Sequence, residues 1–466
     1  MPGRARRIGR ATACLVALFL LAGCGQRPPV LPTSMPEAPP SVGVGVASAT
    51  PSVSSPVPPA TPSAAPDTPT PLLPSSPLPD PATLKNALAK VPTKDLGQTG
   101  IFVADEQGNP LVSRGDKPMI PASTMKVLTA LAAIDVLGAD IRYTTAVVDG
   151  GNGRVVLVGG GDPLLTGDRS DSAIRPASLA TLASRTAKAL KAEKKKNVTL
   201  VYDATLFSGP GWNSSWKKKW KSHMPQVSAL EANGGMRDAW NSEPNPAKSA
   251  AQDFAKRLGK AGIKVGGVKA GKAPVGASTL ASVDSPQLSA MVSDMLLYSN
   301  NLTAETLARH LGLAASGKGT FTTGSAALTA WLKAHQLWED GMRVDGGSGL
   351  STKSRVGPSV LALAVSRALA DPRYQAVVAG LPQAGVSGTL KDRFAKKNEA
   401  AGRKAVHAKT GTLDGVSALA GYVQTKDGAT LTFAAMVNKS DGHAAAATDW
   451  LDRSAAILAG CGCQKK

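Results

Sequence analysis

An α+β fold interrupted by an insertion is the fold class that this sequence predicts, for two reasons. Apolar residues recur at helical spacing in separate segments, most clearly in a helix at 123–137 and in a helix-turn-helix pattern at 289–311. Strand-like runs form a late block at 415–437, and a closing helix at 444–458 follows it. The long interval between the first two helices leaves room for an inserted segment. The 42% hydrophobic and 18% charged composition is that of a globular protein rather than a transmembrane bundle.

The other elements follow from periodicity and turn residues. We expect the folded region to begin near residue 83 and to contain helices and strands at 82–89, 100–104, 110–112, 144–148, 155–158, 177–193 and 326–337. Segments of mixed strand and loop character are expected between the helix at 177–193 and about residue 283. The run Gly159–Gly161 predicts a turn rather than a phosphate loop, because no Lys-Ser/Thr pair follows it.

The N-terminus has the pattern of an export signal. Four arginines precede a short apolar stretch at 11–22, which is shorter than the roughly 20 residues that a membrane-spanning helix needs. The stretch ends in Leu21-Ala22-Gly23-Cys24, which resembles a lipobox. We expect residues 1–23 to be a signal peptide and Cys24 to be lipidated, which would hold the exported protein at the extracytoplasmic face of the cell membrane. An ordinary cleaved signal and an uncleaved anchor are the alternatives.

Residues 24–82 are expected to form a disordered linker. The stretch 27–82 holds 18 of the 34 prolines and almost no aromatic or charged residues, so it cannot bury a core. Proline-rich chain is extended, at roughly 3 Å per residue where it is polyproline-like. Such a segment would act as a spacer that holds the folded body away from the membrane.

The net charge of +20 stays strongly positive, at +16, if the four arginines of the signal segment are removed. Around an exported protein the nearest polyanions are phospholipid headgroups and anionic wall polymers, so we expect these rather than nucleic acid as partners. The densest basic cluster is Lys217–Lys219 with Lys221, flanked by Trp216 and Trp220. These side chains either stack on sugars or bases or belong to a solvated loop.

No metal or cofactor site is expected. The five histidines are scattered without the spacing of paired metal ligands, and His407 is expected to be a strand residue rather than a catalyst. Cys461 and Cys463 stand near no histidine run, and they either pair with each other or remain thiols.

Three short motifs occur in order: Ser123-Thr-Met-Lys126, Ser299-Asn300-Asn301 and Lys409-Thr410-Gly411-Thr412. Each is weak evidence alone, and Ser-x-x-Lys also occurs at 214–217 and 215–218. The first motif differs from those two because its serine opens an apolar-faced helix, which places the serine and the lysine one turn apart on one face. The ordered set of three therefore predicts a serine nucleophile.

The chemistry of the three motifs is coherent. A serine hydroxyl needs a base within hydrogen-bond reach to act as a nucleophile. Lys126 can be that base only if burial or a second cation lowers its pKa, and Lys409 can supply the second charge. Ser299 can relay a proton, and the Asn301 amide can hold a peptide group of a substrate. The start of the helix at Ser123 offers free backbone N–H groups for an oxyanion.

The ordered motifs resemble those of the penicillin-recognising serine enzymes, which include D-Ala-D-Ala peptidases and serine β-lactamases. Flanking segments narrow the resemblance to the type-4, or class C low-molecular-mass, penicillin-binding proteins of the S13 peptidase family. The resemblance covers about residues 84–460 and rests on segments at 159–163, 203–210, 299–305, 345–351 and 381–390.

The resemblance implies a transpeptidase-like fold, in which helices flank an antiparallel sheet, and a serine D-Ala-D-Ala carboxypeptidase that β-lactams inhibit. DD-endopeptidase action is a second cleavage that it allows. Ser123 would be acylated by the penultimate D-Ala of a peptidoglycan stem peptide with Lys126 as base, and Ser299 would pass the proton to the leaving D-Ala. Asn301 would bind the substrate backbone. The terminal carboxylate would be bound by the strand that carries Lys409, Thr410, Gly411 and Thr412, and the oxyanion by the N–H groups of Ser123 and Thr412.

The resemblance also implies domain boundaries. The interval between the first and second motifs is short for this family, so we expect one inserted domain or a trimmed pair. As one domain it would be 145–284, within a catalytic domain made of 83–144 and 285–466. A serine β-lactamase and a non-catalytic wall-binding lipoprotein are the alternative functions. The first would turn over penicillin rapidly, and the second would not be labelled by it.

Overall fold

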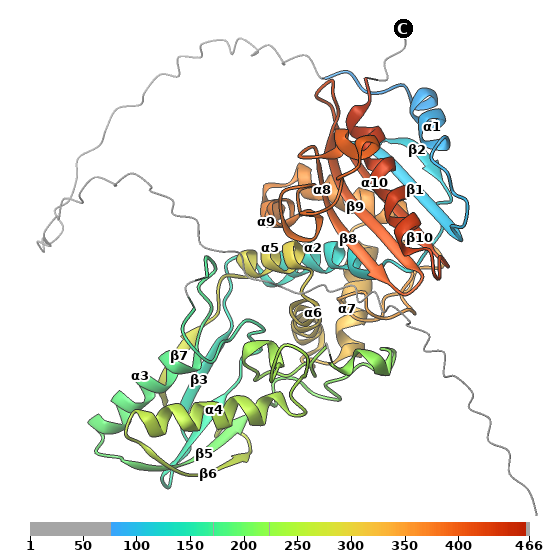
Figure 1. Cartoon of the computed structure of the whole chain (residues 1–466). Coiled ribbons are helices and arrows are strands. Elements are labelled where there is room, and N and C mark those ends of the chain that lie inside the picture. The colour runs from blue at the N-terminus through green and yellow to red at the C-terminus, as the bar shows by residue number, and fades with distance from the viewer. Residues whose placement is uncertain (1–75, 171, 223, 463–466) are drawn as a thin grey trace, which may run out of the picture. The chain divides into compact units, whose positions relative to one another are not determined.

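The computed structural model describes residues 76–462, apart from Asp171 and His223. The expected signal peptide, Cys24, most of the expected linker and Cys463 lie outside the described residues. All the elements named below belong to the unit formed by residues 73–466. Figure 1 shows that they are built on two separate β-sheets.

The first sheet has five antiparallel strands in the order β2-β1-β10-β9-β8. Its strands are β1 (Gln98–Asp105), β2 (Pro110–Arg114), β8 (Val406–Leu413), β9 (Val416–Gln424) and β10 (Thr430–Asn438). The first two come from the start of the folded region and the last three from its end. Because β1 pairs directly with β10, the chain between them can hold additional elements without interrupting the sheet.

Helices cover both faces of this sheet because side chains alternate along each strand. In β10, Phe433 and Val437 pack in one apolar core, whereas Ala434 and Met436 pack in the other. Figure 1 shows α10 lying along the strands β8, β9 and β10. The first core contains α1 (Pro81–Ala89) and α10 (Ala444–Gly460), and the second contains α2 (Met125–Leu137), α5 (Leu288–Tyr298), α6 (Asn301–Ser316), α7 (Phe321–Ala334), α8 (Pro358–Ala370) and α9 (Gln375–Gly380).

The second sheet is mixed, in the order β6-β5-β4-β3-β7. β4 and β5, and β5 and β6, pair in parallel, whereas β3 pairs antiparallel with both β4 and β7. Its strands are β3 (Thr144–Asp149), β4 (Arg154–Val158), β5 (Asn197–Asp203), β6 (Lys264–Ala270) and β7 (Thr279–Asp284). The chain therefore enters this sheet on β3 and leaves it on the neighbouring strand β7.

Two helices, α3 (Leu179–Ala192) and α4 (Pro246–Lys260), pack on one face of the second sheet. The sequence predicted only mixed strand and loop segments from 194 to about 283, and this is wrong for α4. The buried side of α4 consists of Phe254, Leu258 and several alanines. These residues fall on one face at helical spacing, but only two of them are large and the helix as a whole is polar, so the apolar face is easily overlooked in the sequence.

Several boundaries around the first sheet also differ from the prediction. The helices α8 and α9 were not predicted, and α1 occupies the last two residues of the expected linker. α7 was expected at 326–337. It begins earlier because Thr320 and Thr323 form a capping box, and it ends before Gln336, whose φ is 58°.

Two further observations concern the ends and surface of the fold. Cys461 is buried and disulfide-bonded, which rules out the free-thiol alternative for this residue. Within residues 76–462, no helix is both long enough and apolar enough to cross a bilayer.

Candidate active site

Ser123 lies in a single 3-10 turn, Ala122–Thr124, that leads directly into α2. Ala122 has a φ of 47°, a left-handed conformation that costs an L-residue roughly 1–2 kcal/mol. The turn is held by Thr124 Oγ1, which donates to Pro121 O at 2.7 Å. The side chains on either side of Ser123 are fully buried while Ser123 itself is half-buried. The serine is thus held rigidly without being covered.

The Lys126 amine is fully buried in the first turn of α2. Its Nζ lies 2.9 Å from Ser123 Oγ, 2.7 Å from Asn301 Oδ1 and 2.8 Å from Ser348 O. These three partners belong to three separate segments of the chain and use all the hydrogen-bonding capacity of the amine. The amine is therefore fixed next to the serine oxygen.

Burial lowers the pKa of Lys126 from 10.5 to about 7, and the charge of Glu305 partly opposes this shift. A base with this pKa is neutral in a large fraction of the molecules near neutral pH. The lone pair of the neutral amine can accept the Ser123 proton, which an ammonium group cannot do.

Strand β8 runs directly beside the turn that holds Ser123. A Cβ on Gly411 would approach Pro121 O to 2.8 Å and Ala122 Cβ to 3.2 Å. A side chain at this position would push the strand away from the turn. Gly411 thus allows the third motif to lie next to the first.

The third motif carries one buried amine and two hydroxyl groups. Lys409 is fully buried and its Nζ donates to Thr410 O at 2.9 Å. Burial, and secondly the charge of Lys126, lower the pKa of Lys409 well below its usual value. Thr410 Oγ1 donates to Thr389 Oγ1 at 2.8 Å, whereas Thr412 is exposed. The strand therefore presents an amine and hydroxyls beside the serine turn.

The second motif forms the junction between α5 and α6. Ser299 ends α5 in the left-handed region, with φ 60° and ψ 36°. Asn301 opens α6 and is the residue that binds Lys126. No hydrogen bond within the described part of the chain joins the Ser299 hydroxyl to Ser123 or Lys126. Strained non-glycine residues such as Ser299 are concentrated at functional sites.

The segment 345–351 wraps around the turn that holds the serine. Gly349 has a φ of 80°, and a Cβ there would lie 1.8 Å from Ala122 O. Only glycine can occupy this position without displacing the turn. Asp345 accepts a hydrogen bond from Asn213 Nδ2 at 3.2 Å, which ties the segment to a distant part of the sequence.

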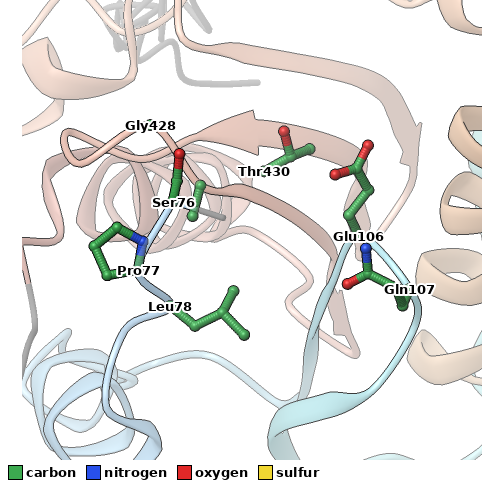
Figure 2. A pocket seen from close by; sticks show the side chains of 8 residues that line it. Ser76, Pro77, Leu78, Glu106, Gln107, Gly428 and Thr430 are labelled. Carbon is green, nitrogen blue, oxygen red and sulfur yellow. The ribbon is translucent and has the colours of Figure 1, made fainter. Parts of the chain in front are cut away.

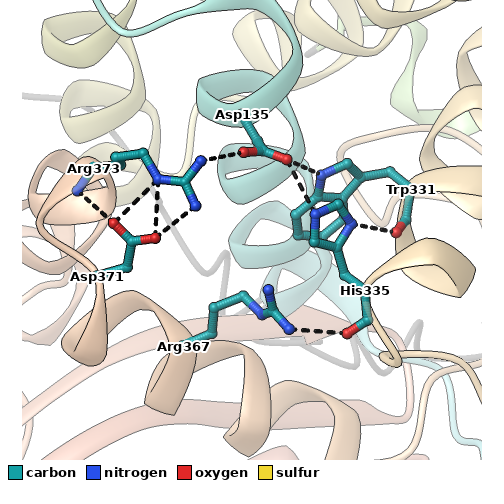
Figure 3. Close-up of polar contacts among 6 residues, drawn as sticks. All are labelled: Asp135, Trp331, His335, Arg367, Asp371 and Arg373. Carbon is teal, nitrogen blue, oxygen red and sulfur yellow. Dashed lines mark hydrogen bonds and ion pairs between the residues drawn. The ribbon is translucent and has the colours of Figure 1, made fainter.

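Asp135 anchors the C-terminal end of α2, the helix that carries Lys126 (Figure 3). Its Oδ2 accepts from Trp331 Nε1 at 2.9 Å and lies 3.2 Å from His335 Nε2. Its Oδ1 accepts from Arg373 Nη1 at 3.0 Å. One carboxylate thus connects α2 to α7 and to the segment between α8 and α9.

The basic and aromatic segment 216–221 contacts the chain immediately after β8. Trp216 is buried in an apolar cluster that includes Leu302, the neighbour of Asn301 in the chain. Lys217 and Lys219 lie 2.8 Å and 2.7 Å from the same oxygen of Asp414. The solvated-loop alternative is therefore wrong for Trp216, which is a core residue, and the two lysines are paired.

The histidines of this region serve packing. His407 lies in β8, as predicted, and its ring stacks on Tyr422 at 4.8 Å. His310 stacks on Tyr143 at 3.8 Å, and burial lowers its pKa to about 4. Among the residues that the structure describes, no group of three or more His, Cys, Asp or Glu side chains is arranged to hold a metal ion.

A separate cavity lies at turns of the first sheet (Figure 2). Its walls contain no residue of the three motifs and no nucleophile beside a base, so nothing there indicates catalysis. It is lined by the β1–β2 turn, the β9–β10 turn and the residues before α1: Ser76, Pro77, Leu78, Glu106, Gln107, Gly428, Ala429 and Thr430.

Two residues near the Lys126 amine were not singled out by the sequence. Ser348 supplies a backbone carbonyl to the amine, and Glu305 accepts a hydrogen bond from Ser348 N at 2.9 Å. A backbone acceptor has no sequence signature, and a glutamate on a helix is usually solvent-exposed. Only the segments 299–305 and 345–351, which carried the family resemblance, pointed toward them.

The chain is similar to known proteins. The model of the D-Ala-D-Ala carboxypeptidase 3 (S13) family matches residues 81–239 and 229–457. Carboxypeptidase DacB of Mycolicibacterium smegmatis is 33% identical over 403 residues, which cover 84% of this chain and 86% of that protein. A D-alanyl-D-alanine carboxypeptidase of an Actinomadura species is 28% identical over 453 residues, with 77% and 81% covered.

Among solved structures, penicillin-binding protein 4 of Haemophilus influenzae matches with a TM-score of 0.66 and 20% identity. The match covers 78% of this chain and 97% of that one. It confirms the predicted fold class, which is α+β of the penicillin-binding-protein and serine β-lactamase type. Since the family model spans most of the sequence and a relative above 30% identity aligns over most of both chains, this protein belongs to the D-Ala-D-Ala carboxypeptidase 3 (S13) family.

Proposed function

We propose that this D-Ala-D-Ala carboxypeptidase uses Ser123 as its nucleophile and the neutral Lys126 amine as its base. The observation that carries the proposal is the 2.9 Å separation of Lys126 Nζ and Ser123 Oγ in a site where burial lowers the pKa of the amine to about 7. In acylation, Ser123 Oγ attacks the penultimate D-Ala carbonyl of a peptidoglycan stem peptide while Lys126 takes the hydroxyl proton.

In this proposal the remaining groups take the roles that the family resemblance implies. Ser299 relays the proton to the nitrogen of the terminal D-Ala as the C–N bond breaks. The backbone N–H groups of Ser123 and Thr412 stabilise the oxyanion. Water then hydrolyses the acyl-enzyme. β-Lactams acylate the same serine and leave slowly, so they act as inhibitors.

Substrate binding uses the second and third motifs. Asn301 Oδ1 accepts from Lys126, which leaves the amide Nδ2 free to donate to a substrate carbonyl. Lys409 binds the terminal carboxylate together with Thr410 and Thr412, on a strand that Gly411 allows to pass beside the serine turn. A bound carboxylate favours protonated Lys409, and this charge lowers the pKa of Lys126 further. Substrate binding would therefore keep the base neutral.

The test compares Ser123→Ala with Ser214→Ala. Ser214 is exposed and belongs to another Ser-x-x-Lys match, so it is a matched control. We expect Ser123→Ala to abolish both D-Ala release and covalent labelling by penicillin, and Ser214→Ala to change neither. Mass spectrometry of the penicillin adduct locates the labelled residue. Persistent labelling of Ser123→Ala would overturn the assignment, and rapid penicillin turnover by the wild-type protein would favour a β-lactamase.

We propose that residues 83–144 and 285–466 form the catalytic domain and that 145–284 form one inserted domain. This division is supported by the two sheets, because the strands of the first come from outside 144–284 and those of the second from within it. The chemistry at Ser123 is the same for a terminal D-Ala and for a D-Ala cross-link, so we propose DD-endopeptidase action as well. Digestion of purified cross-linked dimers, compared with pentapeptide monomers, tests this second cleavage.

We propose that the protein is exported and held at the extracytoplasmic face of the membrane through a lipid on Cys24. The support is the sequence Leu21-Ala22-Gly23-Cys24 after a short apolar stretch. We expect the wild-type protein to incorporate a labelled fatty acid and to sediment with membranes, and Cys24→Ala to do neither. An unlabelled wild-type protein would contradict the proposal.

We propose that the segment 216–221 binds anionic wall polymers. Lys218 and Lys221 are exposed, whereas Lys217 and Lys219 pair with Asp414. Lys218→Ala/Lys221→Ala should therefore weaken sedimentation with isolated walls. Asp414→Ala should strengthen it by releasing the paired lysines, and walls stripped of their anionic polymers should abolish the difference.

A further inference from the structure

Glu305 is a fully buried carboxylate next to the catalytic groups. It lies four residues after Asn301 on α6, which places both side chains on one face of the helix, one turn apart. Its Oε1 accepts hydrogen bonds from Ser348 N at 2.9 Å and from Ser348 Oγ. A carboxylate taken fully out of water requires such partners, because burial of an unpaired charge is costly.

Ser348 connects this carboxylate to the base. While its N–H and hydroxyl donate to Glu305, its carbonyl accepts from Lys126 Nζ at 2.8 Å. The three residues therefore form a continuous chain from carboxylate to amine. The carboxylate is not in contact with the serine, so its effect must pass through Ser348 and Lys126.

The two glycines before Ser348, Gly346 and Gly347, allow this segment to lie close against α6. Gly346 has a φ of 85°, and a Cβ there would lie 2.8 Å from Glu305 Oε1. A Cβ on Gly347 would lie 2.5 Å from Ala304 O. The segment that carries Ser348 thus runs too close to α6 for larger residues, and Glu305 is the side chain that binds it there.

We propose that Glu305 is a positioning residue for the catalytic base: its carboxylate holds Ser348 against α6 so that the Ser348 carbonyl and Asn301 together fix the Lys126 amine toward Ser123. The inference rests on the proposed role of Ser123 and Lys126. In this arrangement α6 controls two of the three hydrogen bonds of the amine, one directly through Asn301 and one through Glu305 and Ser348.

The carboxylate also acts on the amine through its charge. The Glu305 charge raises the pKa of Lys126, opposing the larger effect of burial. For Glu305 itself, burial raises the pKa, and the hydrogen bonds from Ser348 and Gly347 oppose this. The other charged groups acting here are Lys409 on β8, which repels Lys126, and Arg309 on α6, whose own environment includes Glu231.

The experiment measures penicillin acylation of Ser123 as a function of pH in the full chain. This rate is expected to rise with pH along an acidic limb and then to reach a plateau. Removing the charge in Glu305→Gln should move the acidic limb to lower pH, because Lys126 loses the interaction that raises its pKa. The plateau rate should fall about tenfold, which is about 1.4 kcal/mol, because the neutral amide holds Ser348 less firmly than the carboxylate does. Glu305→Asp keeps the charge but is shorter, so it should lower the plateau and leave the limb in place.

Glu399→Gln is the matched control, because Glu399 is also buried but lies in the helical segment Lys397–Gly402 away from the motifs. It should leave both the limb and the plateau unchanged. Folding of each variant is checked by thermal unfolding. If folded Glu305→Gln keeps the wild-type limb and plateau, or if Glu305→Asp moves the limb as Glu305→Gln does, the positioning role is overturned. If wild-type Ser123 is not acylated at all, it is the proposed function that fails.

Discussion

The chain carries the pattern Ser-x-x-Lys in two regions, at 123–126 and at 214–218, and their environments are opposite. Lys126 is fully buried, contacts Ser123 and two further acceptors, and has its pKa lowered to about 7 by burial. In the other region, Lys217 is exposed to 42% and is paired with a carboxylate, Asp414.

The difference shows that the Ser-x-x-Lys pattern alone does not determine the environment of its lysine. A lysine in water is an ammonium ion and cannot accept a proton from serine. We expect reactivity at 123–126 because the surrounding helices bury the Lys126 amine and because α6 and Ser348 hold it. Substitutions in the two regions test which of these features separates them.

The largest expected effect is that of Lys126→Ala. Loss of a general base typically lowers a rate by 10²–10⁴-fold, so we expect penicillin acylation to slow by about 10³-fold while the protein stays folded. Lys218→Ala, in the exposed region, should change acylation less than about twofold. Stopped-flow acylation rates provide the comparison, and equal rates for the two variants would remove the distinction between the regions.

The second prediction concerns the packing around the serine turn. Gly349→Ala would place a Cβ 1.8 Å from Ala122 O, in a left-handed backbone conformation. We expect a loss of about 3 kcal/mol or more in the free energy of unfolding, together with slower acylation. Gly317 has a similar φ but open space around it, so Gly317→Ala should cost only about 1 kcal/mol. Urea denaturation measures both, and equal costs would show that the turn does not need this close approach.

The third prediction is the pH dependence. Lys126 must be neutral to act as base, so acylation should rise with pH up to about 7, the pKa of this amine, and then level off. Well below that pH the rate should fall about tenfold per unit, because the neutral fraction does. Because burial lowers the pKa of Lys409 well below its usual value, its charge is lost well below pH 10.5, and binding of substrates that end in a carboxylate should weaken as the pH rises through that lowered pKa. A rate that keeps rising to pH 10 would mean that the amine has an ordinary pKa.

The smallest effect is expected for the anchor of α2. Asp135→Ala leaves the buried Trp331 Nε1 without its partner and removes contacts to His335 and Arg373, so we expect a loss of about 1–3 kcal/mol in stability. Asp414→Ala removes exposed ion pairs and should cost less than about 1 kcal/mol. Thermal unfolding compares the two, and the reverse order would contradict the anchoring role.

The sequence predicted the parts of the fold that are rich in large apolar residues. The helices containing Lys126 and Asn301 and the strands β9 and β10 were found within a few residues, because leucine, methionine and valine mark their buried faces. α4 was missed because it is polar overall and its buried face carries only two large apolar residues, Phe254 and Leu258. The mixed pairing of the second sheet could not be predicted, since strand order depends on contacts between segments far apart in the chain.

For the site, the sequence supplied the three motifs but not the environment of the amine. Ser123, Lys126 and Asn301 come together as the motif order suggested. The parts that were missed are a backbone carbonyl, that of Ser348, and a carboxylate whose importance depends on burial, that of Glu305. Both are properties of the tertiary structure, which residue types do not encode locally.

The most direct test is an NMR titration of the side-chain amines in protein carrying ¹³C-labelled lysine, with Lys126 assigned from the signal that Lys126→Arg removes. The account predicts that Lys126 titrates near pH 7 and that its signal shifts when Ser123 is acylated. A titration near pH 10.5, the ordinary lysine value, would contradict it, because the amine would then be charged throughout the pH range in which the enzyme has to work.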